Sequence, residues 1–294
     1  MLINNNKLIQ LEELNNFEKM KWDIPEKHIM NEPFKLIISR GGLRFYYGAG
    51  IGYALNKLCK QNIVGIRGVS AGSVVATAIA TDQILPVWLD SYYLLRKNQE
   101  EHKSFIETLL EFDETILPHN AHILANKNKL EVVMNEITWW GLKKTTINYF
   151  YSRDHLIKCV AASCCIPFLT YTKFPFAINI DGKYYIDGAI MNPTPPVEYD
   201  QSINQLVIDL TKFNYPIQYR FQANDPNIHK CIIQGGLDMV SFLNTSTNTN
   251  VIQYHRKPIQ KSIIVKYLII RVLYRTFTNI SYFIMLILRK LKMV

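Results

Sequence analysis

The strongest constraint on the fold is a pattern that occurs twice between residues 34 and 85. Each copy begins with a short apolar run, continues through a turn that contains glycine, and ends in a segment with helical spacing of apolar residues. The first copy combines FKLIIS (34–39) with RFYYGAGIGYALNKLCK (44–60), and the second combines NIVGIRG (62–68) with AGSVVATAIATDQIL (71–85). Strands that alternate with helices in this way are typical of α/β folds with a largely parallel sheet.

Later segments add further strands and helices. FAINI and KYYID flank Asp181-Gly182, and an Asp-Gly pair between β-rich runs favours a two-residue turn, which predicts a hairpin. NQLVIDL predicts another buried strand, whereas residues 85–141 have a mainly helical pattern. Ser152 is the expected N-cap of a helix that ends before Pro167.

Composition divides the chain into four segments. Residues 1–32 are polar and rich in asparagine, which indicates either a loose arm or a short helical lead-in, and residues 33–240 contain the α/β pattern. A Ser/Thr/Asn run within residues 241–260 predicts a linker, and residues 261–294 form a basic, apolar tail. The N-terminus lacks the apolar run of a signal peptide, so we expect the main domain to be cytoplasmic.

The net charge of +9 is concentrated near the C-terminus. No acidic residue follows Asp238, whereas nine basic residues do. A basic and apolar tail favours an anionic membrane surface over nucleic acid, because no recognition element with spaced aromatics accompanies the charge. The longest charge-free run of the tail, residues 276–288, has 13 residues, whereas a bilayer span needs roughly 20. We therefore expect surface attachment, with a C-terminal helix packed on the domain as the alternative.

The five cysteines show no spacing typical of a zinc site. Their number is odd, so they cannot all be paired within one chain. Buried free thiols in a reducing compartment are the expected state.

The pentapeptide Gly68-Val69-Ser70-Ala71-Gly72 lies between a predicted strand and a predicted helix. In a Gly-x-Ser-x-Gly turn the small residues let the strand and the helix approach closely, and the serine takes a strained conformation that projects its hydroxyl group. Ser70 is therefore a candidate nucleophile, with Gly68 and Gly72 as the small residues of the elbow. A plain glycine-rich turn is the alternative.

A serine nucleophile needs a base that takes its proton. Of the seven histidines, only His229 and His255 follow the later acids in the order typical of α/β-hydrolases, and neither lies in a loop of small residues. Asp187 is another candidate base, because it ends a predicted strand and is followed by Gly188, where the backbone can turn. The alternative for this pair is a plain Asp-Gly turn.

A third stretch, SRGGLRFYYGAG, follows the first predicted strand. At the start of a helix, Gly41 and Gly42 present backbone N–H groups that can bind a phosphate or stabilise an oxyanion, and Arg44 adds a positive charge. No Gly-Lys-Ser/Thr follows, which argues against a phosphate-binding P-loop. A dinucleotide site at the glycines of YGAGIG is disfavoured because these glycines fall inside the predicted helix.

Taken together, the three stretches resemble the patatin-like phospholipase family. Residues 40–45 match the family's glycine-rich oxyanion motif, residues 68–72 its Gly-x-Ser-x-Gly elbow, and residues 187–189 its Asp-Gly-Ala motif, all in the family's order. AASCCIPF matches an Ala-Ser-x-x-x-Pro segment, and MNPTPP matches the Asn-x-Pro that often follows the aspartate. The resemblance extends over about residues 34–210.

The resemblance implies a three-layer α/β/α sandwich with a mainly parallel central sheet. It also implies a serine lipid acyl hydrolase, a phospholipase A-type enzyme or a related lipase, that uses a Ser-Asp dyad without histidine. Ser70 would attack the acyl carbonyl, Asp187 would act as general base, and Gly41, Gly42 and Arg44 would form the oxyanion hole. The implied partners are membrane lipids, and neither a metal nor an organic cofactor is implied.

Two positions depart from the family's oxyanion motif. Arg40 replaces its first glycine and Phe45 its last. Arg40 either crowds the loop or adds a charge that favours an anionic head group. Two alternatives to hydrolysis follow: a catalytically inactive relative that binds membranes or proteins, and an acyltransferase that passes the same acyl group to a second lipid.

Overall fold

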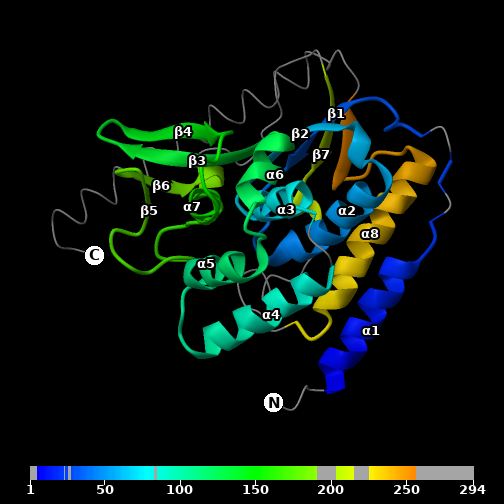
Figure 1. Ribbon diagram of the computed structural model, residues 1–294, viewed down its shortest axis with the longest axis horizontal. Coiled ribbons are helices and arrows are strands. Elements are labelled where there is room, and N and C mark those ends of the chain that lie inside the picture. Colours follow the sequence, from blue (N-terminus) through cyan, green and yellow to red (C-terminus); the bar gives the residue numbers. More distant parts are fainter. Residues whose placement is uncertain are drawn as a thin grey trace.

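The computed structural model (Figure 1) describes residues 5–22, 24–25, 28–82, 85–190, 203–214 and 225–255. Within these ranges the helices are α1 (Asn5–Lys19), α2 (Phe45–Leu58), α3 (Ala71–Ala80), α4 (Leu85–Glu100), α5 (Phe105–Ile116), α6 (Ala121–Lys127), α7 (Arg153–Ser163) and α8 (Ile228–Thr245). The strands are β1 (Phe34–Ile38), β2 (Ile63–Val69), β3 (Leu130–Thr138), β4 (Gly141–Ile147), β5 (Ile178–Ile180), β6 (Lys183–Asp187), β7 (Asn204–Ile208) and β8 (Ile252–His255).

One mixed sheet organises the described part of the chain. Its order is β5-β6-β3-β2-β1-β7-β8, and β4 pairs with β3 outside this path. The central strands β7, β1, β2 and β3 are mutually parallel, whereas β4, β5, β6 and β8 pair antiparallel with their neighbours. Helices flank the sheet, so the predicted α/β/α sandwich with a mainly parallel sheet is confirmed.

The apolar content of the central strands explains their position. In β1, Leu36, Ile37 and Ile38 are all buried, as expected for a strand that is covered on both faces. The two strand–turn–helix units found in the sequence become β1–α2 and β2–α3. The helices α4, α5 and α6 confirm the mainly helical pattern of residues 85–141, but the strand β3 at the end of this stretch was not predicted. Alternation is weak in LEVVMNEIT because Val132, Val133 and Met134 are all buried.

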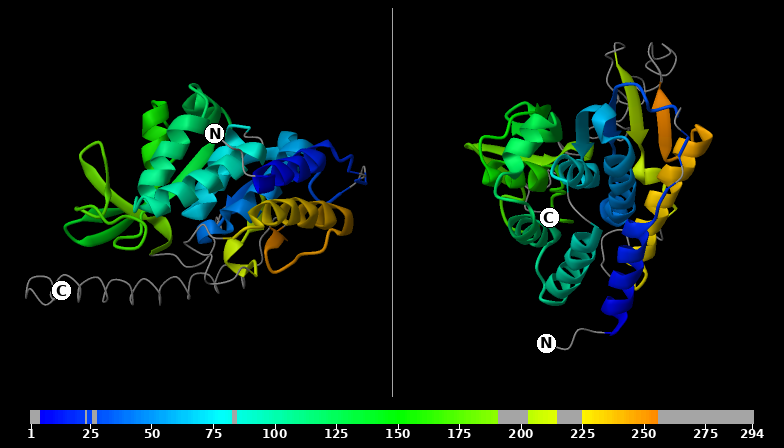
Figure 2. Two further views of the ribbon diagram at one scale, coloured as in Figure 1. Left: turned by 90° about the horizontal axis from the view of Figure 1, so that it is seen from below. Right: turned by 45° about the vertical axis from the view of Figure 1, so that its right-hand side comes forward.

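The N-terminal segment is helical and packed on the domain. Of the two expectations for residues 1–32, the helix is the one found, as α1, and Leu14 and Phe17 bury their side chains in the common core. Figures 1 and 2 show α1 beside α8. A loose arm is therefore the wrong description of α1.

The expected linker 241–260 also differs from the structure. Its start belongs to α8, and β8 pairs antiparallel with β7 at the edge of the sheet. The Ser/Thr/Asn run forms the connection between them, in which Thr249 Oγ1 accepts a hydrogen bond from Ile252 N at 2.9 Å. Ile252 is fully buried, so this segment contributes to the core. The tail 261–294 lies outside the described residues.

The glycines of YGAGIG have a packing role in α2. A Cβ atom added to Gly50 would lie 1.8 Å from the carbonyl oxygen of Ile232 in α8, and one added to Gly235 in α8 would lie 2.0 Å from that of Tyr47. The two helices therefore touch backbone to backbone. On other faces of α2, a Cβ atom on Gly48 would lie 2.9 Å from Val75 Cγ2 and one on Gly52 would lie 2.6 Å from Ile79 Cγ1, both in α3. Helix packing therefore explains all three glycines without any nucleotide.

We predict that Gly50→Ala lowers the free energy of unfolding by about 2–4 kcal/mol, because the methyl group must push two backbones apart. Chemical denaturation measures this difference. Gly65→Ala is the matched control, since a Cβ atom there would meet its nearest neighbours at 3.8 Å. Equal stabilities of the two variants would contradict close α2–α8 packing.

Candidate active site

Ser70 and Asp187 meet because two strands end at the same edge of β3. A strand has two hydrogen-bonding edges, and β4 occupies one of them along Val132–Thr138. The strands β2 and β6 must therefore share the other edge. There β2 ends with Val69 opposite Val133, and β6 ends with Asp187 opposite Met134. The residue after Val69 is Ser70, so the two side chains arrive at neighbouring positions from opposite directions.

The backbone at Ser70 forms the predicted elbow. Ser70 has φ 55° and ψ −132°, a left-handed conformation that is strained for a residue with a side chain. A Cβ atom on Gly68 would lie 2.4 Å from Gly72 O, and one on Gly72 would lie 2.3 Å from Ile38 O. Both glycines are therefore required for the close approach of β2, α3 and the end of β1.

The side chains of Ser70 and Asp187 form a short hydrogen bond. Ser70 Oγ donates to Asp187 Oδ2 at 2.6 Å, and the N–H of Ala189 donates to Asp187 Oδ1 at 2.7 Å. Ser70 is 8% exposed and Asp187 is 1% exposed. The carboxylate is thus buried and oriented, with one oxygen fixed by the backbone and the other facing the serine hydroxyl.

Burial controls the ionisation of Asp187. Removal of the carboxylate from water raises its pKa to about 6. The hydrogen bonds from Ser70 and Ala189 and the positive charge of Arg40 lower the pKa and partly offset burial. Asp187 is therefore ionised at pH 7 to 8, yet basic enough to accept a proton.

Two further side chains hold the dyad in place. Ser70 N donates to Ser163 Oγ at 2.8 Å, and Ser163 Oγ donates to Val133 O at 2.7 Å. Asn135 Nδ2 donates to Asp187 O at 2.7 Å. Sequence reasoning assigned no role to these residues. Ser163 could have been identified from the sequence, because it is the serine of the Ala-Ser-x-x-x-Pro match. No such motif includes Asn135, which lies in the stretch with a mainly helical pattern.

The Gly41-Gly42 loop lies beside this turn. Gly72 packs against the carbonyl oxygens of Ile38 and Ser39, which lead directly into the loop. Gly42 has φ 58°, a conformation that favours glycine. Neither the Gly41 nor the Gly42 N–H donates a hydrogen bond to another residue in the ranges that the structure describes. Both groups remain available to a ligand.

The arginine and the phenylalanine of this loop are buried. Arg44 Nε donates to Phe213 O at 3.0 Å, and Arg44 N donates to Gly41 O at 3.3 Å. The bond to Phe213 O connects the loop to the segment after β7. The assignment of Arg44 to an oxyanion hole stays a prediction. The ring of Phe45 packs 4.2 Å from that of Tyr46 and 5.7 Å from that of Trp88, between centroids. Phe45 is thus a core residue.

The histidines of the described residues do not contribute hydrogen bonds to the dyad. His229 Nε2 lies 2.9 Å from Glu13 Oε2, between α8 and α1. Across the described ranges, no histidine forms a hydrogen bond with Ser70 or Asp187. All five cysteines are free thiols, four of them buried. In the same part of the chain, no group of three His, Cys, Asp or Glu side chains is arranged to hold a metal ion.

Comparison with models of protein families identifies a similarity that covers the candidate site. A family model described as "Patatin-like phospholipase" matches residues 36–198, more than half of the chain. A search of curated proteins finds no match. The matched range includes the Gly41-Gly42 loop, the elbow at Ser70 and Asp187. The Asn-x-Pro match in MNPTPP falls within it as well, but outside the residues that the structure describes.

Proposed function

The chain belongs to the patatin-like phospholipase family, and from this premise we propose that it is a serine lipid acyl hydrolase that acts through Ser70 and Asp187. The observation that carries the proposal is the 2.6 Å hydrogen bond between Ser70 Oγ and Asp187 Oδ2. The strained backbone at Ser70 and the burial of Asp187 support it. Enzymes of this family act on lipids, which makes an acyl ester of a phospholipid or acylglycerol the expected substrate.

The proposed reaction has two halves. Asp187 accepts the proton of Ser70 as Oγ attacks the acyl carbonyl, and a tetrahedral oxyanion forms. Asp187 then returns the proton to the leaving alcohol, which leaves an acyl group on Ser70. In the second half, Asp187 takes a proton from water as the water oxygen attacks the acyl-enzyme. The tetrahedral intermediate then breaks its bond to Ser70 Oγ, which receives the proton back from Asp187 as the fatty acid is released.

The oxyanion requires donors that are in place before the reaction. We assign this role to the N–H groups of Gly41 and Gly42, which have no other acceptor among the described residues. The N-terminus of α3, which begins directly after Ser70, adds the positive end of a helix dipole. Arg44 holds the loop through its bond to Phe213 O, so we propose a positioning role for its side chain.

Arg40 and Phe45, which depart from the family's oxyanion motif, are compatible with catalysis in this proposal. Phe45 is in the core, and the charge of Arg40 acts on Asp187 by lowering its pKa. Neither observation favours the inactive alternative. Acyl transfer would use the same acyl-enzyme, with an alcohol in place of water.

Attachment to a membrane would bring such an enzyme to its substrate. We propose that the basic, apolar tail 261–294 provides attachment and that the domain is cytoplasmic. None of the helices within the described ranges is long and apolar enough to cross a bilayer.

A fluorophosphonate probe tests the proposal, since it bonds covalently to an activated serine and releases fluoride. We predict one label per chain, on Ser70, together with hydrolysis of a short-chain chromogenic ester and of phospholipid vesicles. Ser70→Ala should lose the label, whereas the control Ser91→Ala, which changes a buried serine bonded to Trp88 O, should keep it. Absence of label and of hydrolysis in the wild type would favour the inactive binding module.

A further inference from the structure

Two tryptophans are exposed to solvent at the tip of the β3–β4 hairpin. Trp139 is 92% exposed and Trp140 is 93% exposed. The turn that carries them is ordered, because Thr138 Oγ1 donates to Gly141 O at 2.7 Å and Gly141 takes φ 109°. Large aromatic side chains are usually withdrawn from water when the fold allows it. An adjacent, exposed pair on a structured turn therefore indicates a binding role.

A second exposed apolar group lies on the loop between α7 and β5. Phe168, Leu169 and Phe174 are 56%, 54% and 72% exposed. The ring of Phe176 lies 4.3 Å from that of Phe168 and 5.9 Å from that of Phe174, between centroids. These side chains thus form a cluster at the surface.

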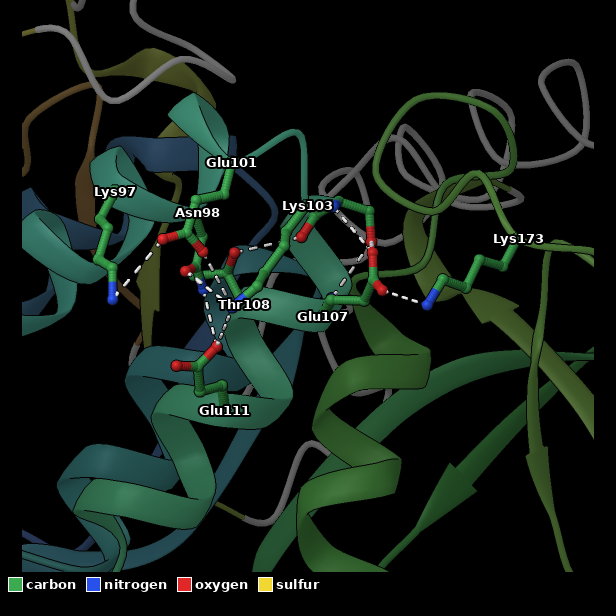
Figure 3. Close-up of polar contacts among 9 residues, drawn as sticks. Lys97, Asn98, Glu101, Lys103, Glu107, Thr108, Glu111 and Lys173 are labelled. Carbon is green, nitrogen blue, oxygen red and sulfur yellow. Dashed lines mark hydrogen bonds and ion pairs between the residues drawn. The ribbon is translucent and has the colours of Figure 1, made fainter.

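The loop is anchored although its aromatic residues are exposed. Thr170 Oγ1 accepts a hydrogen bond from Ile166 N at 2.6 Å and donates to Cys164 O at 2.8 Å. Lys173 forms an ion pair with Glu107 of α5, which Figure 3 shows. The loop between α7 and β5 therefore holds its apolar side chains in solvent on a fixed backbone.

The hairpin and the loop are parts of one body next to the dyad. Leu142 of β4 packs with Ala177, at the end of the loop, and with Ile186 of β6. Cys165 O at the start of the loop accepts the N–H of Asp187 at 2.8 Å. Figures 1 and 2 place β3, β4, β5 and β6 together at the end of the molecule away from α1.

We propose that Trp139, Trp140, Phe168, Leu169 and Phe174 form a membrane-docking surface that brings the Ser70–Asp187 end of the domain to a lipid surface. Tryptophan suits this environment, since its indole combines an apolar ring with an N–H donor and prefers the boundary between lipid and water. The part of this proposal that concerns delivery of lipid substrate to Ser70 and Asp187 rests on the proposed function. The part that concerns lipid binding by the surface does not.

The charges around the membrane-docking surface complement an anionic bilayer. Lys143 and Lys144 follow the tryptophans on β4, and Lys183 lies on β6. Across the strand from Lys143 lies Glu136, which also forms an ion pair with Lys183. The acidic groups beside these three lysines are Glu136 and Asp181, and Asp181 accepts a hydrogen bond from Tyr151 at 2.7 Å. Lysines thus outnumber acidic groups here, and they attract the head groups of anionic lipids. This excess favours a lipid surface over a second copy of the basic chain.

Vesicle binding of the full chain tests the proposal. The probes are vesicles of phosphatidylcholine, alone and mixed with phosphatidylserine, with and without acyl chains that carry bromine. In the wild type we expect a blue shift of tryptophan emission and quenching by the brominated lipids. Trp139→Ala/Trp140→Ala should lose both signals and bind the mixed vesicles at least about tenfold more weakly. Trp139→Phe/Trp140→Phe should retain most of the affinity.

Two controls separate binding from folding and from catalysis. Leu8→Ala removes an apolar side chain that is 49% exposed on α1, away from the hairpin, and should bind vesicles like the wild type. The double alanine variant should melt at the wild-type temperature and should hydrolyse a soluble ester at a rate within about twofold of the wild type. Quenching without any ester hydrolysis would contradict the proposed function and still support this surface.

Three results would overturn the proposal. The first is a wild type that sediments with vesicles while its tryptophan emission is neither shifted nor quenched. The second is a wild type that binds neither kind of vesicle. The third is self-association that depends on Trp139 and Trp140 without insertion into lipid, which would make the surface an interface between two copies.

Discussion

Replacing Ser70 with alanine should reduce kcat/KM for ester hydrolysis by about a thousandfold or more, which corresponds to about 4 kcal/mol of transition-state stabilisation. The reason is specific to the dyad: Ser70 Oγ is the group whose proton faces Asp187 Oδ2. Steady-state kinetics with a soluble ester measure the loss, and unfolding curves check that the variant is folded. Activity within tenfold of the wild type would exclude Ser70 as nucleophile.

Ser70→Gly adds a test of the backbone. Both variants lack the hydroxyl group, but only glycine adopts φ 55° without strain. The strain of a residue with a side chain is worth about 1–3 kcal/mol, and the greater flexibility of unfolded glycine offsets part of it. We therefore expect Ser70→Gly to be more stable than Ser70→Ala by about 1 kcal/mol, with both inactive.

Asp187→Asn should also abolish most activity, by about a hundredfold or more, because the amide cannot accept the proton of Ser70. In the wild type, kcat/KM should rise with pH through about 6, the pKa of Asp187, and remain level above it. The measurement is a pH profile of both proteins on a soluble ester. A wild-type profile that is flat between pH 5 and 8 would contradict the role of Asp187 as base.

Although Asp187→Asn should lower activity, it should not lower the stability of the folded protein at neutral or basic pH. Burial raises the pKa of Asp187 from 3.8 to about 6, so between these pH values the folded protein binds more protons than the unfolded chain. Stability therefore falls as pH rises through this window, and above pH 6 the ionised carboxylate costs about 3 kcal/mol. Asparagine carries no such cost. We expect Asp187→Asn to be as stable as the wild type or more stable at pH 8, and to lose this advantage near pH 4.

The sequence was most informative where backbone geometry restricts residue type. The elbow at Ser70 and the strand β6 that ends at Asp187 were both predicted, since a strand, small residues and a helix in succession leave few alternatives. The hydrogen bond between the two residues was implied only by family resemblance. No periodicity predicts a contact between residues 117 positions apart.

The errors have a common physical cause. In β3 and β8, tertiary pairing decided the structure: LEVVMNEIT lacks clear alternation because it is buried on both faces, and β8 follows polar residues typical of a linker. The bond from Arg44 Nε to Phe213 O could not be predicted for a different reason, because the acceptor comes from a distant segment that no local pattern identifies. The assignment of Arg44 to the oxyanion hole stays a prediction.

Because β2 and β6 both pair with β3, the geometry of the dyad does not depend on the length of the chain between Ser70 and Asp187. Val69, the residue before Ser70, pairs with Val133, and Asp187 pairs with Met134. The dyad is therefore placed by β2 and β6, and not by the helices α4, α5 and α6 of the intervening chain. Insertions in those helices would leave the reacting atoms in place, whereas a one-residue slip of β2 or of β6 along β3 would move them apart. The outer helices are thus open to variation in size, and the catalytic geometry depends on the registers of β2 and β6 along β3.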